Sequence, residues 1–184
     1  MKFFLTWKSW QVFLLVVLLP FGFQFLLMET LMSSSEIDHE MMFNVIPLMM
    51  LVFIALYLLW FWTLGTELNK IIPEKERPSA SRFKFGIKFN AIYMVLFQAF
   101  FISTANGTSF GFLVPVIFIL HICSMYFMFY SIYFISKNLV TFENKVYGTN
   151  KSSTGTFFLM WFFPLGIWFV QPRINKMYAA EPST

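Results

Sequence analysis

Charge is scarce in this sequence. Asp, Glu, Lys and Arg together make up 12% of its 184 residues, whereas an average soluble domain carries roughly 25%. The chain has too few charged groups to cover a water-facing surface, which excludes an ordinary soluble domain. Intrinsic disorder is excluded too, because disordered chains are poor in aromatic residues and here aromatic residues account for 22%. The composition is typical of a multi-spanning membrane protein.

Cysteine and the common catalytic motifs are scarce as well. The single cysteine, Cys123, excludes a disulfide within the chain and a metal site built from several cysteines. The sequence has no phosphate-binding glycine loop and no HExxH metal motif, and its apolar stretches contain no pair of carboxylates. No nucleic-acid-binding module is recognisable. We expect no cofactor, no metal and no nucleic-acid partner.

Long runs without charge are what the sequence does contain, at 9–28, 41–66, 89–136 and 152–172. A helical span needs about 20 apolar residues to cross roughly 30 Å of hydrocarbon. The first two runs therefore predict one span each. The third is long enough for two spans, separated by the turn-forming residues Asn106-Gly107-Thr108-Ser109.

All of these spans are expected to be helices, because backbone groups in lipid must be hydrogen-bonded within their own segment. We predict an all-α integral membrane protein with a single domain over residues 1–184. Its core is a four-helix transmembrane bundle with spans at about 9–28, 42–64, 89–105 and 111–135. Pro20, Pro47 and Pro115 are expected to kink the first, second and fourth helices, since each lacks a backbone donor.

Basic residues occur in alternate connections between the spans. Eleven lie before the first span, in the 67–88 connection or in the 137–151 segment, and none lies in the 29–40 connection or the 106–109 turn. The positive-inside rule places the basic segments in the cytoplasm. The sequence therefore predicts a multi-pass protein with a cytoplasmic N-terminus.

The last apolar segment, at about 156–171, is short for a full span. A fifth span would place Arg173 and Lys176 on the outer side, against the bias of all other basic residues. It would also hold two tryptophans within the hydrocarbon core, although tryptophan prefers the membrane interfaces. We favour a re-entrant hairpin that turns at Pro164–Gly166 and keeps both tryptophans shallow. A short fifth span is the alternative.

The same segment carries an unusual combination of aromatic, proline, glycine and amide residues. It continues from Trp161-Phe162-Phe163-Pro164-Leu165-Gly166-Ile167-Trp168 into Gln171-Pro172-Arg173-Ile174-Asn175. With the earlier Ile135–Leu139 and Glu143, it resembles the tail of a group of multi-spanning membrane proteins from Bacteroidota, over about 45 of 184 residues. The resemblance implies a bacterial inner-membrane localisation and transfers no catalytic residue. The residues of this candidate interface motif are Trp161, Pro164, Gly166, Trp168, Gln171, Arg173 and Asn175.

Polar residues inside the spans are candidate functional groups, because they are expensive to place in lipid. Gln98 and His121 lie near the middle of the third and fourth spans, and Gln24 and Asn44 share a depth near the outer face. Hydrogen bonds between helices would explain both pairs. A proton relay or ligand site, and a polar vestibule opening outward, are the functional alternatives. A haem with two histidine ligands is disfavoured, because the other histidine, His39, is in the outer connection.

Two basic groups are expected to act at the membrane surface. Arg82, Lys84 and Lys88 alternate with apolar residues just before the third span, a pattern that suits anionic lipid headgroups. Arg173 is expected to bond to the 137–151 segment, with Glu143 as its acidic partner, or to lipid phosphate. The alternative is that its side chain only extends into the headgroup layer.

For function, no complete set of catalytic groups can be assembled from this sequence. The main hypothesis is a non-enzymatic accessory or assembly subunit of a larger membrane complex, with the lipid bilayer and other membrane subunits as partners. The alternative is a small carrier or pore for a solute or ion, formed by self-association, in which Gln24, Asn44, Gln98 and His121 line an aqueous path.

Overall fold

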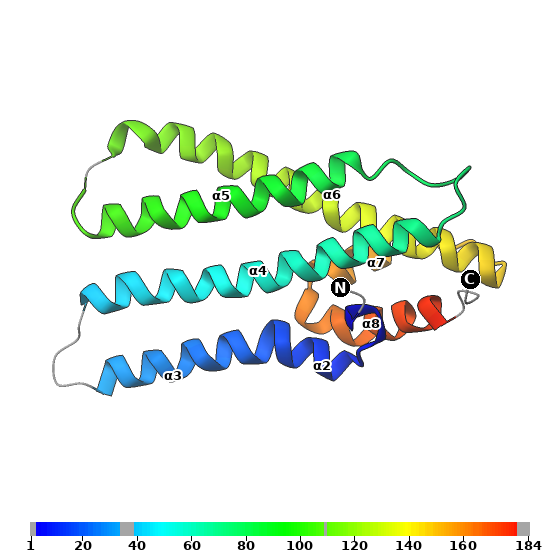
Figure 1. The fold of residues 1–184 in the computed structure, drawn as a ribbon, viewed down its shortest axis with the longest axis horizontal. Helices are drawn as coiled ribbons and strands as arrows, with labels where there is room; N and C mark the ends of the chain where they lie inside the picture. The colour runs from blue at the N-terminus through cyan, green and yellow to red at the C-terminus, as the bar shows by residue number, and fades with distance from the viewer. Residues whose placement is uncertain (1–2, 34–38, 109, 180–184) are drawn as a thin grey trace.

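The computed structural model describes residues 3–33, 39–108 and 110–179, and these residues contain helices and connections but no strand (Figure 1). The expected all-α fold is confirmed. The elements are α1 (Phe3–Thr6), α2 (Ser9–Phe13), the π-helix η1 (Leu14–Leu18), α3 (Leu19–Ser33), α4 (His39–Ile71), α5 (Ser81–Ala105), the 3-10 turn η2 (Gly111–Leu113), α6 (Val114–Tyr147), α7 (Thr154–Trp161) and α8 (Phe163–Ala179).

Among the residues that the structure describes, four stretches of helix are long and apolar enough to cross a membrane. They overlap the four expected spans, although the third begins at Ser81 rather than near 89. The four stretches are Ser9–Thr30, Phe43–Ile71, Ser81–Ala105 and Gly111–Tyr147. The central helix is α4, which packs on α3, α5 and α6 (Figure 1).

Both α4 and α6 are longer than a span requires, with 33 and 34 residues. The fourth span was expected to end near 135, but α6 continues to Tyr147 and stops at Gly148, whose φ of 60° is left-handed. Glycine adopts this conformation without a steric penalty, so it terminates the helix. The extra turns hold residues 136–139 and Glu143, which lie beyond the expected span.

We call one end of the molecule the basic end. It holds the α4–α5 connection (72–80) and the α6–α7 connection (148–153), which lie on the right in Figure 1. An ion pair of 3.0 Å between Lys145 and Glu76 joins these two regions. The α5–α6 turn is at the opposite end.

The prolines act differently from one another. The π-helical turn η1 comes immediately before Leu19 and Pro20, so the first spanning helix departs from α geometry where a kink was predicted. Pro47 lies inside α4 and Pro172 inside α8. The kink predicted at Pro115 is wrong, because Pro115 is in the first turn of α6. Proline is tolerated there, since its missing N–H would have no helical partner.

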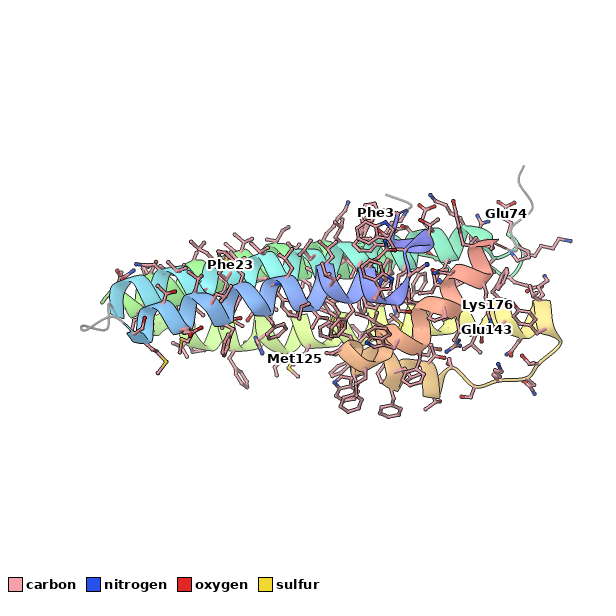
Figure 2. The ribbon with its side chains drawn as sticks, turned by 90° about the horizontal axis from the view of Figure 1, so that it is seen from below. Phe3, Phe23, Glu74, Met125, Glu143 and Lys176 are labelled. Carbon is pink, nitrogen blue, oxygen red and sulfur yellow. The ribbon has the colours of Figure 1, made fainter. Side chains whose placement is uncertain are left out.

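The hydrophobic core is concentrated in the half of the bundle near the basic end. Trp60, Phe61, Leu64 and Leu68 of α4 are fully buried there. Gly65 lets the Phe83 ring of α5 lie directly on α4, because a Cβ at this position would come within 2.2 Å of the ring. Figure 2 shows how densely side chains gather around this half of the molecule.

The C-terminal segment is a pair of helices, α7 and α8, that pack against each other. Their turn is at Phe162, whose carbonyl accepts from the N–H groups of Leu165 (3.0 Å) and Gly166 (2.9 Å). The turn predicted at Pro164–Gly166 is therefore two residues too late. Pro164 instead belongs to the first turn of α8, a position that proline favours.

Candidate functional site

The tip of the α7–α8 hairpin reaches the middle of the bundle. Phe163 packs on the rings of Phe53 and Tyr57 in α4, with centroids 5.8 and 4.7 Å apart, and Trp161 packs on Phe129 of α6 at 4.8 Å. Phe53 precedes the end of α4 by 18 residues, which is about 27 Å of helix.

The end of α8 returns to the basic end, where Arg173 contacts Glu143 of α6. The chain therefore enters and leaves the bundle at the same end, as a re-entrant hairpin does and a fifth span does not. Trp161 is at the tip, where it packs on Phe129, and Trp168 packs on Phe13 of the first spanning helix. Their depth in the membrane stays a prediction. The turn at Phe162 places Trp161 next to the tip, at the end of α7.

Gly166 is the closest point between the two hairpin helices. A Cβ added here would lie 1.6 Å from the backbone oxygen of Leu159 in α7. Only glycine allows this approach, because every other residue would place a carbon inside the carbonyl oxygen. The glycine of the motif thus has a packing role.

Gln171 and Asn175 join α8 to the N-terminal segment. The Gln171 Nε2 lies 2.5 Å from the oxygen of Phe4, 3.1 Å from that of Trp7 and 3.0 Å from Asn175 Oδ1. Asn175 Nδ2 also donates to the Trp7 oxygen, at 3.0 Å. Phe4 lies in the short helix α1 and Trp7 directly after it, so neither carbonyl has a further helical turn to bond with. The two amides supply the missing donors.

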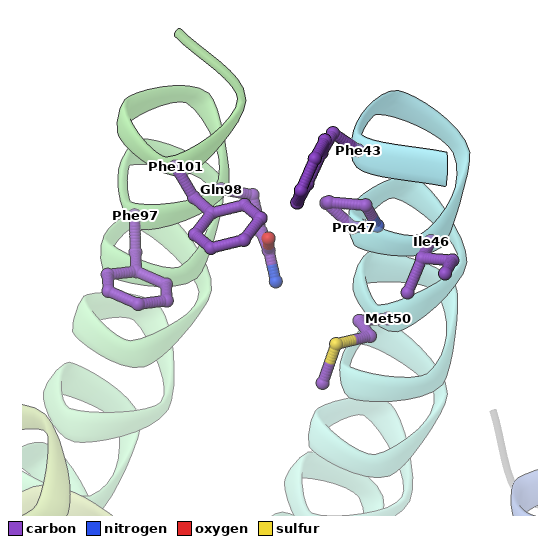
Figure 3. A pocket seen from close by; sticks show the side chains of 7 residues that line it. All are labelled: Phe43, Ile46, Pro47, Met50, Phe97, Gln98 and Phe101. Atoms are coloured by element: carbon purple, nitrogen blue, oxygen red, sulfur yellow. The ribbon is translucent and has the colours of Figure 1, made fainter. Parts of the chain in front are cut away.

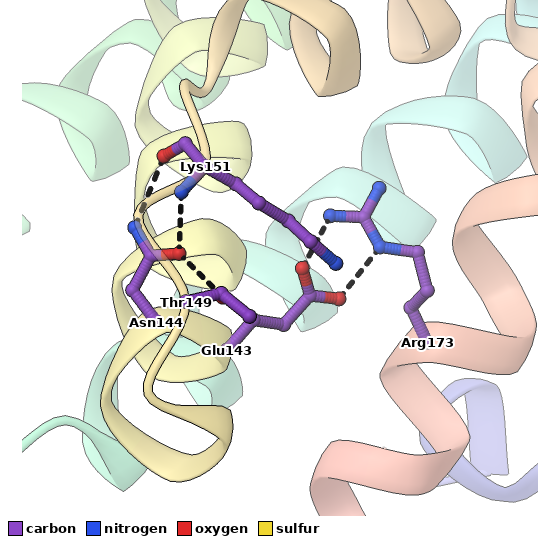
Figure 4. Close-up of polar contacts among 5 residues, drawn as sticks. All are labelled: Glu143, Asn144, Thr149, Lys151 and Arg173. Atoms are coloured by element: carbon purple, nitrogen blue, oxygen red, sulfur yellow. Dashed lines mark hydrogen bonds and ion pairs between the residues drawn. The ribbon is translucent and has the colours of Figure 1, made fainter.

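Arg173 and Glu143 form the ion pair that the sequence suggested. The Arg173 Nε and Nη2 donate to the two carboxylate oxygens at 2.6 and 2.8 Å (Figure 4). The Glu143 side chain is 7% exposed and that of Arg173 25%. A two-point contact between planar groups fixes both distance and orientation, so the pair anchors the far end of α8 to α6.

The outward face of the hairpin is aromatic. We call this surface the hairpin face, and its large apolar side chains are 46–68% exposed. Its members are Phe158, Trp161, Phe162, Leu165, Trp168 and Phe169. Several of the rings also touch one another, including Trp161 and Phe162 with centroids 6.2 Å apart.

Of the polar residues inside the spans, His121 pairs with a residue that the sequence analysis did not name. Its Nδ1 is 2.8 Å from the hydroxyl of Tyr93 on α5, and Gln98 lies elsewhere. Residues 93 and 121 are nearly equidistant from the α5–α6 turn, so counting depths from that turn could have identified the pair. A second pair, Asn90 and Ser124, joins the same two helices.

Gln98 points instead into the space between α4 and α5. Figure 3 shows its amide beside the Phe101 ring and opposite Phe43 and Pro47 of α4. The cavity has a volume of about 290 Å³ and an almost wholly apolar lining. Its chemistry suits an acyl chain or another apolar group with one hydrogen-bonding atom.

The two outer-face residues, Gln24 and Asn44, have different surroundings. Asn44 Oδ1 accepts from Asn106 Nδ2 at 3.0 Å, which ties α4 to the end of α5. Gln24 is half-buried on α3, and in the described residues no hydrogen bond joins it to Asn44.

The three predicted headgroup residues are exposed at the start of α5. The Arg82 guanidinium lies over the Tyr130 ring of α6, 5.5 Å from its centroid. Lys88 lies at the edge of a groove of about 320 Å³ between α5 and α6, lined mainly by Phe85, Phe89 and Ile92. Their contact with lipid stays a prediction.

Among the described residues, no three His, Cys, Asp or Glu side chains gather as metal ligands would. Comparison of the chain with protein-family models, curated proteins and solved structures found no match.

Proposed function

We propose that this protein is a non-enzymatic accessory or assembly subunit of a larger complex in a bacterial inner membrane. In this proposal the hairpin face binds a transmembrane helix of a partner subunit. The main support is the broad apolar surface of the hairpin face. The hairpin that carries it is fixed by the close helix contact at Gly166 and by the bonds of Gln171 and Arg173.

A surface that is ordered before binding loses little conformational entropy in the complex. Phe and Trp are also enriched at the buried cores of protein interfaces. The hairpin face combines these properties, since its helices pack closely at Gly166 and its ends are bonded to α6 and to the N-terminal segment.

The polar groups within the spans support a structural role. Tyr93 bonds His121, and Asn90 bonds Ser124. Such contacts join helices in a membrane, and they leave these groups less available for catalysis.

The orientation and lineage are parts of the same proposal. The clustering of the α4–α5 and α6–α7 connections at one end supports a cytoplasmic basic end, by the positive-inside rule. Membership of the Bacteroidota group rests on the tail motif.

The test is purification of the tagged protein from its native membrane in a mild detergent, with identification of co-purifying chains. The proposal expects a stoichiometric partner that is lost in the double variant Leu165→Ala and Phe169→Ala. The control is Phe25→Ala and Phe118→Ala, at apolar positions on α3 and α6 that are 70% and 66% exposed. The proposal is contradicted if the partner is lost from both double variants. It is also contradicted if the tagged protein purifies without any other chain.

A second candidate is a small carrier or pore formed by self-association. The cavity beside Gln98 favours it, since a buried amide in an apolar wall is a feature of small-molecule sites. A homo-oligomer that transports a solute into liposomes, with transport reduced by Gln98→Leu, would support this function instead.

A further inference from the structure

A pocket with three cationic side chains lies at the basic end, where α6, the α6–α7 connection and α8 meet. It has a volume of about 250 Å³, and Lys151, Arg173 and Lys176 line it together with Glu143, Phe142 and Met177. We call it the basic pocket. Its residues come from three separate segments that the hairpin brings together.

The charges in the basic pocket do not balance. Glu143 is bonded to Arg173 through both of its oxygens, which leaves Lys151 and Lys176 as two further positive charges. Within the described residues, neither lysine has an ion-pair partner. Arg173 and Lys176 also lie three residues apart on α8, so their side chains are neighbours on one helix face. A bound anion would therefore be attracted by two neighbouring positive charges on α8.

The position of Lys151 is set by the backbone. The Asn144 Oδ1 accepts from the Lys151 N–H at 2.8 Å and from the Thr149 hydroxyl at 2.9 Å, while Asn144 Nδ2 donates to the Lys151 oxygen at 3.0 Å. Figure 4 shows the Lys151 side chain extending from this anchored backbone toward the Glu143–Arg173 pair. The lysine is thus held over the pocket before any ligand arrives.

We propose that the basic pocket binds a phosphate group through Lys151, Arg173 and Lys176. Two of the three Arg173 nitrogens bond Glu143, and the third is available for a phosphate oxygen. Phe142 and Met177 give the pocket an apolar wall, which suits a phosphate attached to an organic group. Basic pockets between helices at the membrane surface bind anionic lipid headgroups in this way, and a soluble phosphate ester offers the same chemistry.

The experiment uses the purified full-length protein in a mild detergent. Binding is measured with fluorescent phosphatidylglycerol, and the competitors are unlabelled phosphatidylglycerol, phosphatidylcholine with the same acyl chains, and glycerol 3-phosphate. The test variant is Lys151→Gln with Lys176→Gln. Its control is Lys75→Gln with Lys137→Gln, which removes the same charge from exposed positions outside the pocket.

We expect the pocket variant to bind phosphatidylglycerol at least about tenfold more weakly, since each lysine near an anionic headgroup contributes on the order of 1 kcal/mol. The control pair should change binding less than about threefold, because its charges act only at a distance. Competition by glycerol 3-phosphate at concentrations similar to the lipid identifies a soluble phosphate ester as ligand. Competition by phosphatidylglycerol alone identifies the lipid, and both results support the proposal.

The proposal is overturned if the pocket and control variants weaken phosphatidylglycerol binding equally. It is also overturned if phosphatidylglycerol and phosphatidylcholine compete equally well and glycerol 3-phosphate has no effect. If the double variant fails to purify, Lys176→Gln alone replaces it. This lysine is exposed in the last turn of α8. Its loss should weaken binding about fivefold, and unchanged binding counts against the pocket.

Discussion

At the scale of single residues, Gly166 determines how closely α7 and α8 approach. A methyl group here would overlap the Leu159 carbonyl oxygen, and relieving the overlap would require the two helices to separate. We expect Gly166→Ala to destabilise the protein by at least about 2 kcal/mol, measured as thermal unfolding in detergent.

The matched control for that prediction is Gly155→Ala in α7, where an added Cβ meets nothing within 4 Å. This change should be neutral or stabilising by up to about 1 kcal/mol, since alanine favours helix more than glycine. Similar unfolding temperatures for the two variants would mean that the close approach at Gly166 is not essential to the hairpin.

The Glu143–Arg173 pair makes a second prediction at this scale. Arg173→Ala leaves a carboxylate that is mostly shielded from water without its partner, which we expect to reduce stability by about 2 kcal/mol. The double variant Glu143→Gln with Arg173→Ala removes the unpaired charge and should recover part of that loss. A double-mutant cycle in urea or by heating measures the coupling, and additive effects would argue against an anchoring pair.

At the scale of elements, the hairpin depends on α8 being held to the N-terminal segment. Gln171 and Asn175 bond the carbonyls of Phe4 and Trp7. We expect Gln171→Ala to speed hydrogen exchange of the α1 amides and of the Trp7 amide, which bonds the Phe3 oxygen. Exchange in α5 should stay unchanged, because Gln171 holds only the N-terminal segment to α8. Gln24→Ala on α3 is the control and should leave α1 exchange as it was. Slow exchange in both variants would show that apolar packing alone holds α1.

The helices themselves were predictable from the sequence, because charge-free length alone determines which segments can span a membrane. The re-entrant path was also predictable, since Arg173 and Lys176 favour the basic end. The turn position was not, because proline is compatible both with a turn and with the first residues of a helix. The role of Gly166 depends on the Leu159 backbone, which no local pattern reveals.

A polar contact between two spans could be predicted only where the two residues lie at the same depth and at least one of them is unusual in an apolar helix. His121 stood out as a histidine in an apolar span, but its partner is a tyrosine, a residue common in membrane helices. The Gln171 contacts join residues more than 160 positions apart in the chain. Such pairs follow from the packing of α1 on α8, for which the sequence offers no depth or charge signal.

At the scale of the whole molecule, the two halves of the bundle differ. The half near the basic end holds the hairpin and most fully buried side chains, including Trp60, Phe61 and Ile135. Toward the opposite end the helices expose large apolar side chains such as Phe25, Phe112 and Phe118. Helices in a membrane gain stability from packing contacts rather than from avoiding water. The half of the bundle near the basic end should therefore be the last part to unfold.

The central claim is that the chain crosses the membrane four times and that its last segment turns back. The most direct test is the sidedness of a reporter fused after Thr184, compared with one fused after Asn106 in the α5–α6 turn. Our account predicts that the two fusions report opposite sides, with the Thr184 fusion in the cytoplasm. If the Thr184 fusion reports the same side as the Asn106 fusion, the last segment crosses the membrane and the re-entrant hairpin is wrong.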